Sequence, residues 1–226
     1  MTTIDSSSRI DVLGQLLHER HSCRAFLPTA VPDSTIEQLL LLAQRAPSWC
    51  NTQPWKVVVT RGHGTELVRR ELTAAGNEEP DLPFPEAYHA PYGERRREAA
   101  RRLYEAVGVE WGDRGASARE AARNFELFGA PHLAVVTTDA TLGPYGALDC
   151  GTYVQTFLLA AQALGVGAIP QAAIALRSRT IHRSLNIPDD RIILCGISFG
   201  WPDPDHPGAA VRTDRAPLTD VVTYVD

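Results

Sequence analysis

The sequence contains a single lysine, four scattered cysteines and no long apolar run. Lys56 is the only lysine among 22 basic residues, and so heavy a use of arginine indicates codon bias more than a role for any one arginine. The cysteines form no C-x-x-C pair, and no histidine stands at a metal-ligand spacing. These absences argue against a zinc site, and no metal-binding residue is expected.

The chain also lacks the patterns of targeting and membrane segments. Its first residues, MTTIDSSSRID, have no basic region followed by an apolar stretch, so no secretory signal is expected. The most apolar stretch, VQTFLLAAQALGVGAI, includes two glutamines and a threonine, and is too short and too polar to span a bilayer. With its free cysteines, the protein is expected to be cytoplasmic and to have no membrane partner.

The composition is that of an ordinary globular protein. The 226 residues are 44% hydrophobic and 22% charged, which is typical of soluble domains. The net charge of −5 argues against nucleic acid as the main partner, because that partner requires a basic face. No repeats or low-complexity linkers appear, which favours one domain over residues 1–226.

Hydrophobic periodicity predicts a mixture of helices and strands. Helices are expected over 9–20, 32–46, 64–75, a stretch ending near 107, about 117–128, 147–165 and 178–186. In the second of these, Ser34 and Glu37 have the spacing of a capping box. Strands are expected over 55–61, 131–138 and 191–201, with 167–174 as strand or loop and 219–226 as a possible edge strand. The elements do not alternate strictly as βαβ units, which favours an α+β fold.

The segment 78–115 departs from this pattern. Four prolines precede an Arg- and Glu-rich helix. One interpretation is a solvated excursion from the fold. The other is a lid-like insertion over a pocket, because long irregular insertions in compact domains often cover binding sites.

Two short motifs match functional patterns without their structural context. GISFG, residues 196–200, matches a hydrolase nucleophile elbow, which requires a strand, a turn and then a helix. Here the motif ends a predicted strand, and the following WPDPDHP cannot open such a helix. GVGAIP, residues 165–170, begins like a dinucleotide fingerprint, but it follows a helix and has Pro170 in place of the third glycine.

A cluster of cations and a hydroxyl follows the first predicted helix. ERHSCRAF places Arg20, His21, Ser22 and Arg24 within five residues. Forked guanidinium groups suit a phosphate. The alternative is a helix C-terminus whose cations complement the helix dipole.

Several segments in order complete a larger pattern. RHSCRAF is followed by the loop APSWCNTQPW, by D-C-G-x3-Q at the start of a helix, by GVGAIPQ, and by RTDRAPLTDVV near the end. In this order they resemble the FMN-dependent nitroreductase family over roughly residues 9–226. The R-x-S-x-R element and the A-P-S-x-x-N-x-Q-P-W loop are the most specific parts.

The resemblance implies roles for particular residues. Arg20, His21, Ser22 and Arg24 would hold the FMN phosphate, ribityl chain and pyrimidine. Pro47, Ser48, Trp49 and Asn51 would approach the flavin from the other subunit, although Asn51 and Gln53 also suit a loop tied to its own backbone. Pro170, Gln171 and Ala172 resemble the loop beside the reactive ring edge. Arg215, and more weakly Arg212, resemble the late phosphate-binding arginine.

The resemblance also implies a fold and an activity. The expected fold is nitroreductase-like α+β, with a central mixed sheet flanked by helices, in an intertwined homodimer with FMN at the interface. The expected activity is NAD(P)H-dependent reduction of nitroaromatic or quinone-like small molecules by ping-pong hydride transfer, with no catalytic side chain. Alternatives are a specialised enzyme of the same fold, such as a reductive dehalogenase or flavin destructase, and a non-enzymatic flavin-binding protein.

Overall fold

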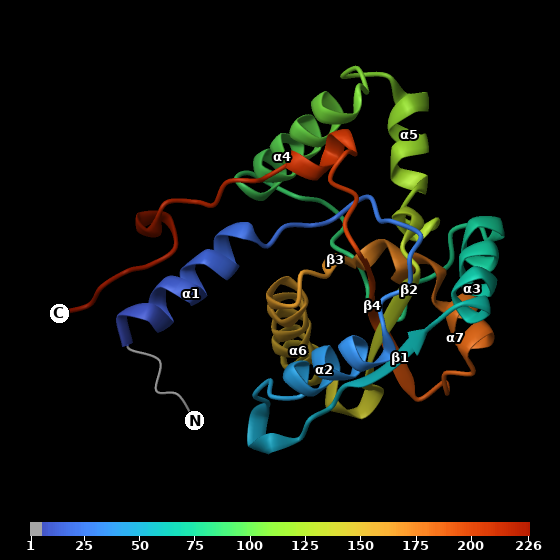
Figure 1. The fold of residues 1–226 in the computed structure, drawn as a ribbon, viewed down its shortest axis with the longest axis horizontal. Coiled ribbons are helices and arrows are strands. Elements are labelled where there is room, and N and C mark those ends of the chain that lie inside the picture. The colour runs from blue at the N-terminus through green and yellow to red at the C-terminus, as the bar shows by residue number, and fades with distance from the viewer. Residues whose placement is uncertain (1–5) are drawn as a thin grey trace.

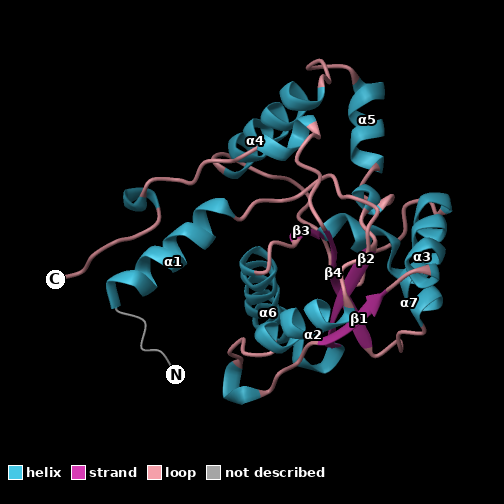
Figure 2. Cartoon of the chain, in the orientation of Figure 1, coloured by secondary structure: helices cyan, strands magenta, loops and turns pink. Residues whose placement is uncertain are grey.

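The computed structural model describes residues 6–226. Its α-helices are α1 (Ser6–Glu19), α2 (Asp33–Ala43), α3 (His63–Ala74), α4 (Tyr92–Val107), α5 (Arg114–Ala122), α6 (Gly143–Ala163) and α7 (Ser178–Leu185). Its strands are β1 (Lys56–Thr60), β2 (His132–Asp139), β3 (Gly167–Gln171) and β4 (Arg191–Gly200). Figure 1 shows their arrangement, and Figure 2 separates helices from strands. The α+β class expected from the sequence is confirmed.

The four strands form one sheet in the order β1-β2-β4-β3. Every pair of neighbours runs antiparallel. The expectation of a mixed sheet is therefore wrong for the described chain. The C-terminal residues 219–226, expected as a possible edge strand, form no strand.

Both faces of the sheet are buried. Because side chains alternate along a strand, Ala134 and Val136 of β2 face one core cluster, with α2 and α6. Leu133 and Val135 face the other, with α3 and α7. The two helical layers on either side of the sheet are visible in Figure 1, and between them β2 is buried from residue 132 to residue 138.

The start of α2 differs from the expected capping box. The helix begins at Asp33 with Pro32 at the N-cap position and no side-chain cap. Ser34 therefore lies inside the first turn. The Asp33 carboxylate accepts instead from Arg61 in an ion pair of 2.7 Å.

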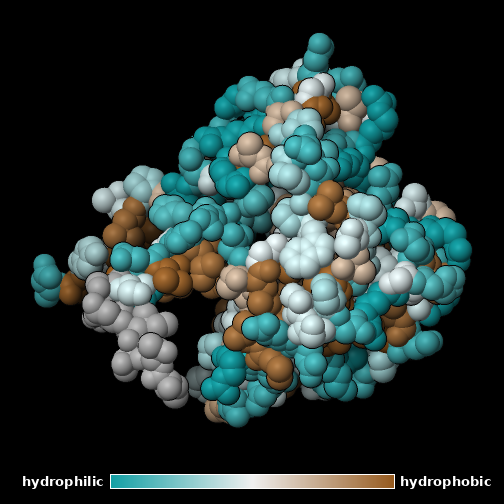
Figure 3. All heavy atoms as spheres, viewed as in Figure 1, coloured by the Kyte–Doolittle hydropathy of each residue, from teal (hydrophilic) through white to brown (hydrophobic). Residues whose placement is uncertain are grey.

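Three parts of the chain lie outside the sheet and its covering helices. The α1 helix and the C-terminal segment lie on one side, and α4 of the insertion projects from one end together with the α5 helix that follows it (Figure 1). Ile10, Leu13 and Leu17 on α1 are exposed, and Figure 3 shows apolar surface along this helix. Within residues 6–226, no helix has the length and apolar character needed to cross a membrane.

Candidate functional site

A cavity of about 810 Å³ lies among α1, the lid-like segment and the C-terminal segment. Among the described residues 6–226, four arginines and two histidines line it, and no aspartate or glutamate does. In a chain of net charge −5, such a concentration of positive charge defines an anion-binding cavity. Its lining residues are Leu17, His18, Arg20, His21, Ser22, Arg24, Ala99, Gln155, Val211, Arg212, Thr213 and Arg215.

The segment 20–26 presents one wall of this cavity. The backbone N–H of Cys23 donates to the carbonyl oxygen of Ala168 on β3 at 3.1 Å. Burial alternates along the segment, as in extended chain: Cys23 is buried, while Ser22 and Arg24 are half-buried and line the cavity. The predicted cluster is therefore held by backbone pairing to the sheet and is not a simple helix end.

The cations in the cavity affect one another. Burial lowers the pKa of Arg20, and the positive charge of Arg215 lowers it further. Burial is the main cause that lowers the pKa of His21, and the positive charge of Arg212 lowers it further. A hydrogen bond with the carbonyl oxygen of Glu19 acts in the opposite direction and raises it. The imidazole of His21 is consequently neutral at pH 7. An anion in this cavity would relieve repulsion among the arginines.

The C-terminal arginines are held by local backbone contacts. Arg212 donates to the carbonyl oxygen of Ala209 at 2.8 Å, and Arg215 donates to the carbonyl oxygen and the hydroxyl of Thr213, each at 3.0 Å. Both side chains are exposed. They keep N–H groups that can bind a ligand from the solvent side.

A second cavity, of about 410 Å³, adjoins the first and shares Ser22 and Arg24 with it. Pro170, Gln171 and Ala172, at the end of β3, line this second cavity. The structure thus brings nine of the predicted site residues around two connected spaces. They are Arg20, His21, Ser22, Arg24, Pro170, Gln171, Ala172, Arg212 and Arg215.

The side chain of Gln171 is used to fix the end of β3. Its amide donates to the carbonyl oxygen of Asn124 at 2.9 Å, and its Oε1 accepts from the buried hydroxyl of Ser198. Ser198 lies inside β4 and is fully buried. The hydrolase interpretation of GISFG is thereby excluded, because its serine is not exposed at a turn.

The loop 47–53 lies apart from both cavities in this chain. Trp49 N–H donates to both carboxylate oxygens of Asp149 at 3.1 Å, and Gln53 N–H donates to the hydroxyl of Ser48 at 2.9 Å. The side chain of Gln53 donates to the carbonyl oxygen of Asn51 at 3.2 Å, as expected for a loop tied to its own backbone.

Three residues of this loop have strained backbone conformations, yet the indole of Trp49 is exposed. Cys50, Asn51 and Gln53 have φ values of 47°, 56° and 49°, which are uncommon for residues other than glycine. Trp49 is 68% exposed. Neither the arginine cavity nor the second cavity of the same chain is lined by Pro47, Ser48, Trp49 or Asn51.

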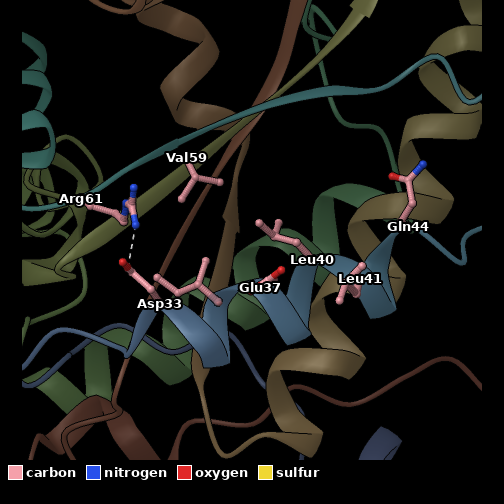
Figure 4. A pocket seen from close by; sticks show the side chains of 8 residues that line it. Asp33, Glu37, Leu40, Leu41, Gln44, Val59 and Arg61 are labelled. Carbon is pink, nitrogen blue, oxygen red and sulfur yellow. Dashed lines mark ion pairs between the residues drawn. The ribbon is translucent and has the colours of Figure 1, made fainter.

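A hollow of about 540 Å³ lies between α2 and β1. Figure 4 shows Leu40, Leu41 and Val59 around it, with the Asp33–Arg61 ion pair at one end. Arg61 is the only cation that lines it, and its charge is already paired. This hollow therefore lacks the free positive charge that a phosphate requires.

Several lining residues were not among the site residues predicted from the sequence. Gln155 and Thr213 belong to two segments of the family pattern, D-C-G-x3-Q and RTDR, so the sequence contained the information needed to include them. Arg96 and Tyr104 on α4 carry no such signal. They reach the second cavity only through the way α4 lies against the fold.

Fold and site together define an α+β protein with a cationic cavity suited to a phosphorylated cofactor. The model of the nitroreductase family matches residues 17–201. A 4-nitrobenzoate reductase of a Nocardioides species is 33% identical, over 96% of this chain and 91% of its own length. Nitroreductase NfnB of Mycolicibacterium smegmatis is also 33% identical, over 93% of this chain and 91% of its own.

Comparison with solved structures also finds nitroreductases. The structure of the FMN-dependent nitroreductase NfnB from Mycobacterium smegmatis in complex with NADPH has a TM-score of 0.92 and 30% identity, and the match covers 96% of this chain and 100% of that one. The FMN- and NADPH-dependent NfnB of a Sphigopyxis strain has a TM-score of 0.90 and 27% identity, covering 94% and 98%. The chain belongs to the nitroreductase family, as expected from the sequence.

Proposed function

We propose that this protein is an FMN-dependent NAD(P)H oxidoreductase that reduces nitroaromatic or quinone-like acceptors. The observation that carries the proposal is the larger cavity, with four arginines and no acid among its lining residues. Relatives described as FMN-dependent, NADPH-bound or nitrobenzoate-reducing support it.

The residues of the larger cavity fit FMN. Arg20 and Arg215, whose charges repel one another, hold the phosphate with forked hydrogen bonds. Arg212 adds charge on the same side. The Ser22 hydroxyl and the Gln155 amide provide hydrogen bonds for the ribityl chain and the pyrimidine. The volume of about 810 Å³ lies within the range of cofactor sites, roughly 300–1,000 Å³.

The protein contributes orientation and electrostatics to the reaction. When bound, FMN supplies the centre that accepts hydride and passes electrons on. Arg24, half-buried and lining both cavities, places positive charge beside the ring and stabilises negative charge there. Gln171, held by Asn124 and Ser198, fixes the end of β3 at the ring edge. Donor and acceptor use the second cavity in turn, which gives ping-pong kinetics.

A second copy of the chain completes the site. Trp49, Tyr145 and Leu148 are each more than 60% exposed, which is unusual for large apolar side chains that are close together. The exposed apolar faces of α1 and of the C-terminal segment add to this surface. In a homodimer, the rigid loop 47–51 of one subunit is brought against the flavin of the other.

The segment 78–115 acts as a cover for the site. Ala99 of α4 lines the larger cavity, and Arg96 and Tyr104 of the same helix line the smaller one. A single helix of the insertion therefore borders both spaces. Its position is that of a lid within a single nitroreductase-like domain.

The test is an anaerobic absorbance spectrum of the purified protein before and after addition of NADPH or NADH. A flavin spectrum that bleaches promptly supports the proposal and identifies the donor. A flavin that stays oxidised with both donors contradicts it and favours a specialised or non-enzymatic flavoprotein. Absence of flavin, even after reconstitution with FMN, contradicts any flavin-dependent function.

A further inference from the structure

The second cavity is walled by the insertion on one side and by the end of β3 on the other. Ala100, Leu103 and Tyr104 of α4 face Ile169 and Phe128 across it. These apolar and aromatic side chains suit a flat ring. The volume of about 410 Å³ is enough for one ring with its substituents, as in small ligand sites.

The charges that line this cavity are not balanced. Arg24, Arg96 and Glu120 are its charged side chains. Glu120 is paired with Arg123 at 3.3 Å, so its negative charge is already compensated. Within residues 6–226, Arg96 forms no ion pair with an acid. An excess of positive charge therefore remains in the cavity.

Arg96 is exposed to solvent and contacts one aromatic ring without losing its hydrogen-bond donors. Its guanidinium lies over the ring of Tyr88, 5.5 Å from the centroid, a cation–π contact that uses the face of the guanidinium and leaves its N–H groups free. Arg24 already serves the flavin in the proposed function. Arg96 is therefore the cation left for the second ligand.

We propose that the second cavity binds an aromatic electron acceptor that carries a carboxylate, and that Arg96 binds this carboxylate in a forked ion pair. The inference rests on the proposed function. A carboxylate matches the two parallel N–H groups of a guanidinium, while the apolar walls hold the ring. Arg96 is then a determinant of acceptor specificity.

A direct binding measurement distinguishes the contribution of the ligand's carboxylate from that of its aromatic ring. Calorimetry of the purified protein compares benzoate with benzamide, its neutral analogue, in wild type and in Arg96→Ala, Arg96→Lys and Arg97→Ala. We expect Arg96→Ala to weaken benzoate binding by about two- to fivefold, since the arginine is exposed and screened by solvent, and to leave benzamide binding unchanged. Arg96→Lys restores part of the affinity. Arg97, exposed on the same helix and absent from the cavity wall, is the matched control.

Steady-state kinetics show whether Arg96 binds a carboxylate of the acceptor or a phosphate of the NADPH donor. For Arg96→Ala we expect KM for 4-nitrobenzoate to rise about two- to fivefold while kcat and the rate with nitrobenzene stay the same. A rise in KM for NADPH alone assigns Arg96 to a donor phosphate and overturns the proposal. Equal losses with both acceptors, or equal benzoate affinity in all variants, also overturn it.

Failure of the proposed function has a different signature. A protein without flavin, or with a flavin that no donor reduces, fails the spectroscopic test above. The calorimetric comparison needs no turnover and still reports whether Arg96 binds the carboxylate. The two failures are therefore distinguished by separate measurements.

Discussion

Arg102 of α4 is bound to Asp214 of the C-terminal segment by an ion pair. The same guanidinium donates to the carbonyl oxygen of Arg212 at 3.2 Å and to Glu98 on its own helix at 2.8 Å. One side chain thereby links the insertion to the segment that carries Arg212 and Arg215. The position of α4 and the geometry of the proposed phosphate site are coupled through it.

We expect Arg102→Ala to weaken FMN binding severalfold, because the segment 212–215 loses its anchor to α4. Fluorescence titration of apoprotein with FMN measures the change. Arg101→Ala removes the same charge from the same helix, but Arg101 pairs only within it, with Glu98 and Glu105. This control should bind FMN as wild type does.

Asp214→Asn separates anchoring from simple electrostatics. Removing a negative charge near the arginines should strengthen the binding of a phosphate if only the net charge matters. Loss of the anchor predicts the reverse, a weaker complex. Stronger binding by Asp214→Asn would contradict the coupling.

The second prediction concerns the two arginines that repel one another. Replacing Arg20 or Arg215 by alanine should each raise the Kd for FMN by about ten- to a hundredfold, since a hydrogen bond to a charged group contributes about 1.5–3 kcal/mol. The double variant should purify without flavin. The loss should shrink at high salt, because these groups are partly exposed. Arg70→Ala, at an exposed arginine on α3, serves as the control. Retention of FMN by the double variant would contradict the proposed role of Arg20 and Arg215 in binding the FMN phosphate.

Local spacing explains which predicted site residues lie together in the structure. Arg20, Ser22 and Arg24 lie in one short segment, so their pattern alone brought them to the same wall. The rejection of GISFG was correct for a similar reason, since the prolines after Trp201 are visible in the sequence. Arg212 and Arg215 required the family pattern, because nothing local joins them to Arg20.

Other features depend on contacts that no local pattern contains. Arg96 lines the second cavity together with residues of β3 and α5 that are far from it in the sequence, and an ERRRE run gives no sign of which arginine borders a cavity. The expected mixed sheet was wrong because β1, β2, β4 and β3 pair only in antiparallel fashion within residues 6–226, and the direction of strand pairing is not contained in any local pattern. The capping box failed because Asp33, with Pro32 before it, already begins the helix.

The third prediction concerns the carboxylate beneath the loop 47–53. Asp149 is 7% exposed and accepts from Trp49 N–H and from the Thr52 hydroxyl. We expect Asp149→Ala to lower the free energy of unfolding by about 1–3 kcal/mol, measured by urea denaturation. Asp139→Ala, which removes a carboxylate that caps a separate turn through Thr141, should leave the fluorescence of Trp49 unchanged.

Asp149→Ala also tests the contribution of the loop to the partner subunit. A loop that has lost its support should weaken FMN binding in the dimer, although Asp149 lines neither cavity of its own chain. Unchanged FMN affinity in a folded, dimeric Asp149→Ala would contradict a role for this loop at the flavin.

The last prediction concerns the root of the insertion, where Asp81 accepts from His182 Nε2 at 2.9 Å and from Ile193 N–H at 2.8 Å. Burial lowers the pKa of His182, but the hydrogen bonds with the Ile187 carbonyl oxygen and Asp81, with the charge of Asp189, outweigh it and raise the pKa overall. A raised pKa means that the folded state holds the proton more tightly than the unfolded state does. The stabilisation is therefore complete below about pH 6.5, the ordinary value for histidine, and is lost as pH rises through the folded pKa.

We expect His182→Gln to remove this part of the pH dependence, because glutamine keeps a donor for Asp81 but has no proton to lose. Urea denaturation of wild type and variant, from about pH 5.5 to 8.5 across the histidine range, should give curves that diverge at low pH and converge at high pH. Asp81→Asn should flatten the curve in the same way, since it removes the charge that favours protonated His182. Curves that stay parallel over the whole range would show that the His182–Asp81 pair does not titrate with folding.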